Sequence, residues 1–493
     1  MKRNMFLKVK NINIATGGPL IAILNCKDAN KLNLQEGDRI LLKKGKKEII
    51  APINITDLSH PKEGQIGLYS ELSTVLKTTN GQKLKIKPTH IPKSIELIRK
   101  KLDGTILTKK EIKIIVKDLI ENDLTEIELT YFVAGCYNKD LTKKETEYFT
   151  KAAIKHGTKL KLNKKLIVDK HSPGGVPNNR TTMLITPILA AAGLTIAKTS
   201  SRAITSPSGT VDTMEVLAKV KFSVKEIKNI VKKTKGCIVW GSGTELAGGD
   251  EKLIHVRHPL KLDPEGLMIA SILSKKASVG STHILLDFPI GKTAKIKSVK
   301  EAKKLKKKFV DLGKKLGMKI KGIITDGSEP IGNGIGPALE ARDILYILRR
   351  DNKAPKDLEE KAISMANKIF KMTKTKKDAK KILESGLAYK KMKEIIKAQR
   401  GKASIKPEEI SIGKYNYSVK SSRTGKVKEI DNKKITRIAR TAGAPSYKEA
   451  GIYLYKHKKS KVKRGEKLFT IYSNSRDKLN RAKLISKQVI RIK

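Results

Sequence analysis

A repeated succession of strand, loop and helix from about residue 164 limits the folds open to this chain of 493 residues. The β-branched segment KLIVD precedes a loop and the helical sequence RTTMLITPILAAAGL, and TIAKT precedes a second loop and the helical sequence TMEVLAKV. GCIVWG, HILLDFPI and KIKGIITDG are three further candidate strands. Strands that alternate with helices are typical of a parallel sheet covered by helices. The sequence therefore predicts a multi-domain α/β protein with a central parallel α/β domain over residues 164–404.

Three segments outside this predicted domain have other patterns. Residues 1–90 alternate β-branched residues with glycine and asparagine, which predicts an N-terminal β-barrel-like domain that we expect to serve assembly. Residues 91–163 change to helical periodicity, with Thr108 and Glu111 at the spacing of a capping box. The segment of about 247–282 interrupts the strand–helix alternation, and we expect it to join this helical domain. Residues 405–493 return to strands and predict a C-terminal barrel-sandwich β domain, with a glycine-centred hairpin in KVKRGEKLFTIYS.

The net charge of +58 is compatible with a polyanionic partner such as nucleic acid. Only 17 of the 106 basic residues are arginine, which nucleic-acid readers favour for bidentate contacts, and aromatic residues make up only 4% of the chain. We therefore attribute the charge mainly to composition and expect no specific nucleic-acid partner. A basic nucleic-acid-binding protein stays the alternative from another functional class.

The cysteine content and the hydropathy pattern bear on the compartment. Cys26, Cys136 and Cys237 are odd in number, far apart and outside any CxxC motif, so they support neither a disulfide framework nor a structural zinc site. No apolar run approaches the ~18 residues that a membrane span requires. We expect a cytoplasmic protein without membrane contact.

Two loops that follow predicted strands carry residue types that bind phosphate. In DKHSPGGVPNNRTT a glycine pair lies between a strand and a helix, where backbone N–H groups can converge on an anion, and Lys170 and Ser172 add side-chain donors. The loop KTSSRAITSPSGT is crowded with serine and threonine and contains Arg202. Donor-rich loops at neighbouring strand ends match the crevice where α/β sheets bind ligands. Plain strand-to-helix turns and solvated hydroxyl groups are the alternatives that the residues alone leave open.

A third segment, around Asp263, places one acidic residue just before a predicted helix. Ser271 and Lys275 share one face of this helix at the i, i+4 spacing. Taken alone, Asp263 is a candidate for the N-cap of the helix.

The motifs KHSPGGV, SSRAITSPSGT and ASILSKK together resemble the nucleoside phosphorylase family that contains the thymidine and pyrimidine-nucleoside phosphorylases. The resemblance extends over nearly the whole chain, including GNGIGPALEARDIL and the tail from RIARTAGAPSYKEAG to GEKLFTIYS. It is strongest toward the archaeal branch of the family, which releases adenine from AMP.

This resemblance implies a pentosyltransferase that converts AMP and inorganic phosphate into adenine and ribose 1,5-bisphosphate, with CMP and UMP as further candidate substrates. It implies a homo-oligomer, a dimer or a larger assembly, and no metal or redox cofactor. A phosphorylase of unphosphorylated pyrimidine nucleosides is the nearest alternative.

The resemblance also assigns residues to roles. Asp263 matches the acid that protonates the leaving base. Lys170, Ser172 and Ser200 match positions that hold the attacking phosphate. The matching nucleotide-binding positions are Gly175, Ser201, Arg202, Ala203, Ile204, Thr205, Ser206, Thr210, Ser271 and Lys295. The chain departs from the family in VPNN, where VPGN is usual, and in Pro207, which stiffens a segment that is elsewhere rich in glycine and alanine.

Overall fold

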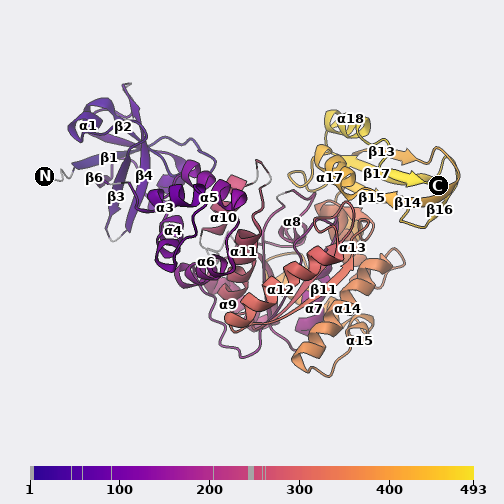
Figure 1. Ribbon diagram of the computed structural model, residues 1–493. Helices are drawn as coiled ribbons and strands as arrows, with labels where there is room; N and C mark the ends of the chain where they lie inside the picture. Colours follow the sequence, from indigo (N-terminus) through magenta and orange to yellow (C-terminus); the bar gives the residue numbers. More distant parts are fainter. Residues whose placement is uncertain are drawn as a thin grey trace. The chain divides into compact units, whose positions relative to one another are not determined.

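The computed structural model describes residues 5–45, 47–57, 59–89, 91–203, 205–241, 249–257, 259–260 and 262–493 (Figure 1). The chain divides into two compact units, Met1–Gly157 with Gly248–Ser271 and Thr158–Ala247 with Ile272–Lys493. The helix α11 (Glu265–Ser278) begins in the first unit and ends in the second. Within the described ranges, no helix has both the length and the apolar character needed to cross a membrane.

The first unit starts with a closed six-stranded barrel in the order β1-β5-β2-β4-β3-β6. Its strands are β1 (Met5–Asn11), β2 (Ala22–Asn25), β3 (Arg39–Lys44), β4 (Lys47–Thr56), β5 (Gln65–Leu68) and β6 (Lys83–Pro88). Side chains alternate between the two faces of a strand, so that Ile40 and Leu42 of β3 are fully buried while Lys43 is exposed. The short helices α1 (Cys26–Lys31) and α2 (Ser70–Leu76) add Ala29, Leu72 and Leu76 to the same core.

A helical bundle completes the first unit. Its helices are α3 (Ser94–Leu102), α4 (Lys109–Glu121), α5 (Glu126–Asn138), α6 (Lys143–His156), α10 (Asp250–Arg257) and the first part of α11. The predicted capping box of Thr108 and Glu111 is present at the start of α4. Leu253 of α10 and Leu267 of α11 are buried in the same apolar core as Val116 of α4.

The second unit contains the parallel sheet. The five strands that the sequence indicates are present as β7 (Val168–His171), β8 (Ile196–Ser200), β9 (Gly236–Trp240), β10 (His283–Ile290) and β11 (Lys319–Asp326). They form the parallel orders β11-β10-β7 and β8-β9, and a parallel bridge between Ile167 and Thr195 links β7 to β8. The helices of this part are α7 (Thr181–Ala191), α8 (Thr210–Glu215), α9 (Val224–Thr234), α12 (Val299–Lys315), α13 (Pro337–Leu348), α14 (Lys356–Thr373), α15 (Ala379–Glu384) and α16 (Leu387–Ala398). The loops that follow β7 and β8 are the two donor-rich loops of the sequence.

Two small antiparallel sheets form the C-terminal part of the second unit. One has the order β12-β15-β17-β13 and the other β16-β14-β18. The strands are β12 (Gly334–Ile335), β13 (Tyr415–Lys420), β14 (Gly425–Ile430), β15 (Gly451–Leu454), β16 (Lys461–Val462), β17 (Lys467–Ser473) and β18 (Ile490–Ile492), with helices α17 (Asn432–Thr441) and α18 (Arg476–Leu484).

The predicted hairpin around Gly465 is wrong in its pairing. Gly465 does form a turn, with a φ of +85°, but β16 pairs with β14 whereas β17 pairs with β13 and β15. Phe469 and Ile471 of β17 are buried in the C-terminal core, and pairing with β13 and β15 on both sides places β17 inside its sheet. Strand pairing over a long sequence separation thus overrides the local hairpin signal.

Candidate active site

The loop after β7 depends on two glycines. Gly174 and Gly175 have φ angles of +91° and +95°, a region that favours glycine. A Cβ atom on Gly175 would also lie 2.5 Å from the backbone nitrogen of Lys295. The structure therefore brings together Gly175 and Lys295, two of the predicted nucleotide-binding positions.

Lys170, at the end of β7, is buried beside a carboxylate. Its Nζ lies 4.0 Å from Oδ2 of Asp287, and the Nζ of Lys361 lies 3.3 Å from the same oxygen. Burial lowers the pKa of Lys170 to about 8, although the Asp287 carboxylate acts in the opposite direction. Lys170 therefore stays mainly charged at neutral pH and loses its charge in mildly alkaline solution.

Asp287 also anchors two uncharged partners. It accepts hydrogen bonds from Thr325 Oγ1 at 2.6 Å and from Asn179 Nδ2 at 3.1 Å, and the same Asn179 nitrogen lies 3.4 Å from Ser172 Oγ. Asp287 thus connects Lys170 with the environment of Ser172, the other phosphate-binding residue predicted on this loop. The sequence contains a signal for Asp287, an acidic residue inside the apolar strand HILLDFPI, but none for Lys361.

Three buried oxygens near this loop lack hydrogen-bond partners among the described residues. They are Asn178 Oδ1 and Asn179 Oδ1, at the end of the loop, and Thr181 Oγ1, at the start of α7. Buried polar atoms are rarely left unpaired, so such atoms at the end of a strand are candidates for contact with a ligand. In the sequence the two asparagines belong to the VPNN motif, whereas nothing marks Thr181.

A second buried charge cluster ties β7 to β8. Asp169 lies 3.3 Å from the Nζ of Lys198 and 2.7 Å from the Nζ of Lys276, and Lys198 also donates to the carbonyl of Lys170 at 2.7 Å. Burial alone would raise the pKa of Asp169, but the two ammonium groups outweigh it and hold that pKa below its usual value. Burial lowers the pKa of Lys276, although its contact with Asp169 acts in the opposite direction. The cluster fixes the two strand ends that precede the donor-rich loops.

Asp212 closes the loop after β8. Its Oδ2 accepts hydrogen bonds from the backbone nitrogens of Ala203, at 2.7 Å, and Gly209, at 2.8 Å. A Cβ atom on Gly209 would lie 2.7 Å from the Ala203 nitrogen, so the two ends of the loop pack directly on each other. Ile204, a predicted nucleotide-binding position, lies outside the described residues.

Arg202 is paired within the protein. Its guanidinium donates to both carboxylate oxygens of Glu215, at 2.8 and 2.7 Å, and lies 4.9 Å from the ring centre of Trp240 at the end of β9. The hydrogen bonds from Arg202 lower the pKa of Glu215 to about 2. The Arg202 side chain is 40% exposed. Arg202 therefore organises the loop through Glu215, and its contact with a substrate stays a prediction.

The hydroxyl groups of the same loop differ in burial and in their hydrogen-bond partners. Ser208 is fully buried and its Oγ lies 2.8 Å from Thr213 Oγ1, so it serves the loop itself. Ser206 Oγ donates to the Ser208 carbonyl at 2.8 Å. Thr205 is exposed, whereas Thr210 is buried at the start of α8. Ser200 and Ser201 are half-buried at the end of β8, next to these residues.

Asp263 and Ser271 belong to the first compact unit, and the loops described above belong to the second. Asp263 Oδ1 lies 3.3 Å from Arg257 Nη1. Asp263 is not the N-cap of α11, because the helix begins two residues later and the carbonyl of Pro264 accepts the hydrogen bond from Met268. Pro264 therefore stands at the cap position, one residue after Asp263.

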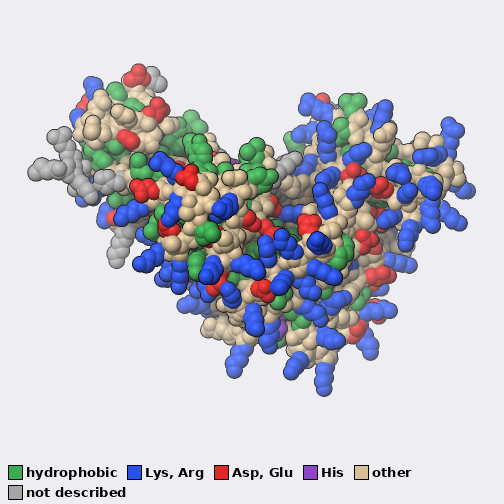
Figure 2. Space-filling model, in the orientation of Figure 1, with side chains coloured by type: hydrophobic (Ala, Val, Ile, Leu, Met, Phe, Trp, Pro, Cys, Tyr) green, Lys and Arg blue, Asp and Glu red, His purple; other side chains and the backbone are tan. Residues whose placement is uncertain are grey.

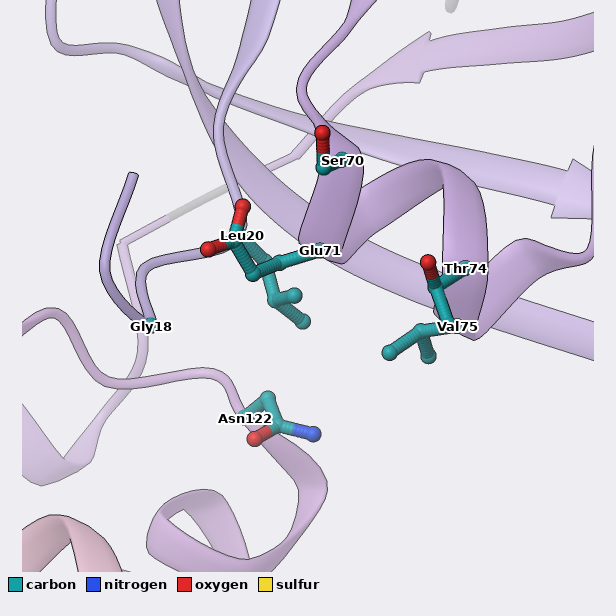
Figure 3. A pocket seen from close by; sticks show the side chains of 7 residues that line it. All are labelled: Gly18, Leu20, Ser70, Glu71, Thr74, Val75 and Asn122. Carbon is teal, nitrogen blue, oxygen red and sulfur yellow. The ribbon is translucent and has the colours of Figure 1, made fainter. Parts of the chain in front are cut away.

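Two other features of the described residues bear on this assignment. Among the described residues, no three histidine, cysteine, aspartate or glutamate side chains gather where they could hold a metal ion. A hollow of about 480 Å³ lies in the first unit (Figure 3), and none of the predicted site residues lines it. Its Glu71 carboxylate already accepts hydrogen bonds from the backbone of Thr16 and Gly17. Lysine and arginine side chains spread over many elements on the visible face (Figure 2).

Models of known families match most of the chain. Residues 95–157 match the glycosyl transferase family's helical bundle domain, residues 164–403 its a/b domain, and residues 426–493 the pyrimidine nucleoside phosphorylase C-terminal domain. The fold is also similar to the crystal structure of anthranilate phosphoribosyltransferase from Thermus thermophilus, with a TM-score of 0.50 and 15% identity over 62% of this chain and 99% of that chain. The class of protein is therefore a glycosyl transferase with the domains of a phosphorylase.

Individual relatives narrow this class. The chain is 47% identical to an AMP phosphorylase of Pyrococcus horikoshii over 99% of this chain and 98% of the relative. It is 43% identical to AMP phosphorylase 1 of Archaeoglobus fulgidus, over 94% of this chain and 93% of the relative. An AMP phosphorylase of Methanococcus vannielii is 39% identical over 98% of this chain and 97% of the relative. The chain belongs to the AMP phosphorylase family.

Proposed function

We propose that the protein catalyses the phosphorolysis of AMP to adenine and ribose 1,5-bisphosphate. The observation that carries this proposal is the 47% identity to an AMP phosphorylase along 99% of the chain, which includes the N-terminal barrel that the family models leave unmatched. The donor-rich loops after β7 and β8 fit a substrate pair that brings two phosphate groups.

In the proposed reaction, an oxygen of inorganic phosphate forms a bond to C1′ while the bond from C1′ to the adenine ring breaks. The electron pair of the broken bond leaves with adenine, and Asp263 supplies the proton that neutralises the departing base. In this mechanism the protein lowers the activation barrier mainly by positioning the two anions and by stabilising the charge of the leaving base. We assign inorganic phosphate to Lys170, Ser172 and Ser200.

The 5′-phosphate of AMP is assigned to the loop after β8. Its binding groups are Ser201, Arg202, Ala203, Ile204, Thr205, Ser206 and Thr210, with Gly175, Ser271 and Lys295 as further nucleotide-binding positions. Thr205 is exposed, and the buried carboxylate of Asp212 holds the backbone that presents it. The binding energy of a remote phosphate aligns C1′ with the attacking oxygen and thereby raises kcat as well as lowering KM.

The assembly and the location of the protein are part of the same proposal. We infer that residues 1–90 form an assembly domain, since the barrel has its own buried core and contains none of the proposed substrate contacts. We expect a homo-oligomer, a C-terminal domain of the barrel-sandwich type, and the domain boundaries predicted from the sequence. The three free cysteines fit a reducing cytoplasm.

Phosphorolysis assays with AMP, CMP, UMP, adenosine and thymidine test the function. Charge-assisted hydrogen bonds contribute roughly 1.5–3 kcal/mol each, so a substrate that lacks two of them should lose about 10²–10⁴-fold in kcat/KM. We expect a loss of this size for adenosine relative to AMP. Equal kcat/KM values for AMP and adenosine, or a preference for thymidine, would assign the protein to the nucleoside phosphorylases instead.

A further inference from the structure

One helix of the C-terminal domain contacts two loops of the α/β domain that carry proposed substrate contacts. At its N-terminal end, Asn432 of α17 donates from Nδ2 to the carbonyl of Gly327 at 2.9 Å and from its backbone nitrogen to Thr293 Oγ1 at 3.3 Å. At its C-terminal end, Arg440 donates from Nη1 to the carbonyl of Ser206 at 3.0 Å. The helix therefore extends from the loop of Lys295 to the loop that follows β8.

Packing and capping fix the position of helix α17 in the C-terminal domain. Ile435, Ile438 and Ala439 are fully buried in the C-terminal core, and the side chain of Asp431 caps the first turn. The domain itself packs closely on α13, since a Cβ atom on Gly451 would lie 3.0 Å from Cδ1 of Leu339 and the backbone nitrogen of Ala338 donates to the carbonyl of Lys448 at 3.0 Å. A donor on α17 is thus fixed relative to the α/β domain.

Arg440 is one of two arginines that hold carbonyl groups of the loop after β8. Arg180 donates from Nη2 to the carbonyl of Ser208, and its Nε lies 2.5 Å from the buried carboxylate of Glu340. A carbonyl oxygen directed at a phosphate would repel it, whereas a guanidinium group engages that oxygen and adds positive potential nearby. With these two carbonyl groups engaged, the exposed hydroxyl of Thr205 is among the groups with which the loop can donate to an anion.

A second link from the C-terminal domain reaches the same loop indirectly. The Nζ of Lys448 lies 3.0 Å from Oε2 of Glu215, the residue whose carboxylate holds the Arg202 guanidinium. Two cations of the C-terminal domain therefore act on one loop, Arg440 on its backbone and Lys448 on the partner of its arginine.

We propose that Arg440 is a positioning residue for the 5′-phosphate of the substrate, acting through the Ser206 carbonyl. This inference rests on the proposed function of the loop in AMP phosphorolysis. The C-terminal domain is then a part of the nucleotide site in addition to any structural role. Lys448 supports the same loop through Glu215.

The test compares Arg440→Met with Arg437→Met, a matched control on the same helix whose arginine is exposed. Steady-state assays on the full-length protein measure KM for AMP, KM for inorganic phosphate, and kcat/KM for AMP and for adenosine. We expect Arg440→Met to lower kcat/KM for AMP by about tenfold, the size expected for one charge-assisted hydrogen bond. The KM for phosphate and the residual activity on adenosine should stay within about twofold, because neither uses the 5′-phosphate contacts.

Arg440→Lys serves as the second variant, since it keeps the charge and the length but loses the planar guanidinium. It should recover part of the AMP activity, and it keeps the test usable if Arg440→Met does not fold. An equal loss for AMP and adenosine, or kinetics identical to those of Arg437→Met, would overturn the positioning role. Failure of the wild-type protein to cleave AMP would instead refute the proposed function, so the two failures are distinguishable.

Discussion

Arg257 Nη1 lies 3.3 Å from Asp263 Oδ1, and the Nε of the same guanidinium donates to the carbonyl of Leu253 at 3.0 Å. Arg257 is 9% exposed, so its charge is fixed in the last turn of α10 beside the proposed catalytic acid. The segment between α10 and α11 is short, and the backbone nitrogen of Leu262 returns to the carbonyl of Arg257 at 3.1 Å. The position of Asp263 is therefore set by the end of one helix and the start of the next.

Asp263→Asn should retain AMP binding and lose activity. Asparagine keeps the shape and polarity of the side chain but has no acidic proton to give to adenine, and loss of a general acid typically lowers kcat by about 10²–10⁴-fold. Calorimetric titration gives the Kd of AMP, and steady-state assays give kcat. Glu265→Gln, two residues along the chain, is the matched control. Wild-type turnover in Asp263→Asn would remove Asp263 from the mechanism.

Phosphate affinity should depend on pH through Lys170. Because burial lowers the pKa of Lys170 to about 8, its positive charge is lost as the pH rises through about 8, and the KM for inorganic phosphate should rise there. KM values measured between about pH 6.5 and 9.5 test this, with the KM for AMP as the internal control. A KM for phosphate that stays constant over this range would contradict a contact between phosphate and Lys170.

The strands and the loops of the α/β domain could be predicted from the sequence because their signals are local. A run of β-branched residues such as KLIVD predicts a strand, and the glycine pair that ends at Gly175 indicates the turn after that strand. The helices α1 and α2 were not predicted, because each is shorter than two turns and lies among strand residues. Pairing around Gly465 was predicted wrongly because it depends on distant strands.

The partners of the site residues could not be predicted, because they come from distant parts of the chain. Lys170 lies beside Asp287 and Lys361 only once the sheet and α14 have packed together. Arg440 and Ser206, which form a hydrogen bond, are 234 residues apart in the sequence. No periodicity or motif encodes such contacts. The sequence indicates which loops carry donors, whereas only the fold shows that Ser208 faces its own loop and that Arg202 is held by Glu215.

Removal of residues 1–90 should reduce the size of the assembly and leave a folded core that binds AMP. The barrel closes with β6, which ends at Pro88, and its apolar core is separate from that of the helical bundle. The ion pair between Arg39 and Glu128, which connects the barrel to α5, would be lost. Sedimentation velocity of the full-length and shortened proteins measures the particle size. An unchanged oligomer would show that residues 1–90 play no part in assembly.

The buried carboxyl group of Asp343 should make the stability of the protein depend on pH. Burial raises the pKa of Asp343 to about 7, although Asn178 and the backbone nitrogens of Asn333 and Gly334 donate hydrogen bonds to it. Its Oδ1 has no hydrogen-bond partner among the described residues. The folded state therefore holds the proton more tightly than the unfolded state, whose aspartate has a pKa of about 3.9.

The stability that comes from this protonated carboxyl group is complete below about pH 4 and is lost as the pH rises through about 7. The loss between about pH 5 and pH 8 should amount to about 3 kcal/mol. Asp343→Asn cannot ionise, so its free energy of unfolding should fall less than that of the wild type over this interval. Urea unfolding of both proteins at the two pH values measures the difference, and Asp477→Asn, at a surface carboxylate that is 66% exposed, is the control. Parallel pH profiles for wild type and Asp343→Asn would show that Asp343 is ionised in the folded protein throughout this range.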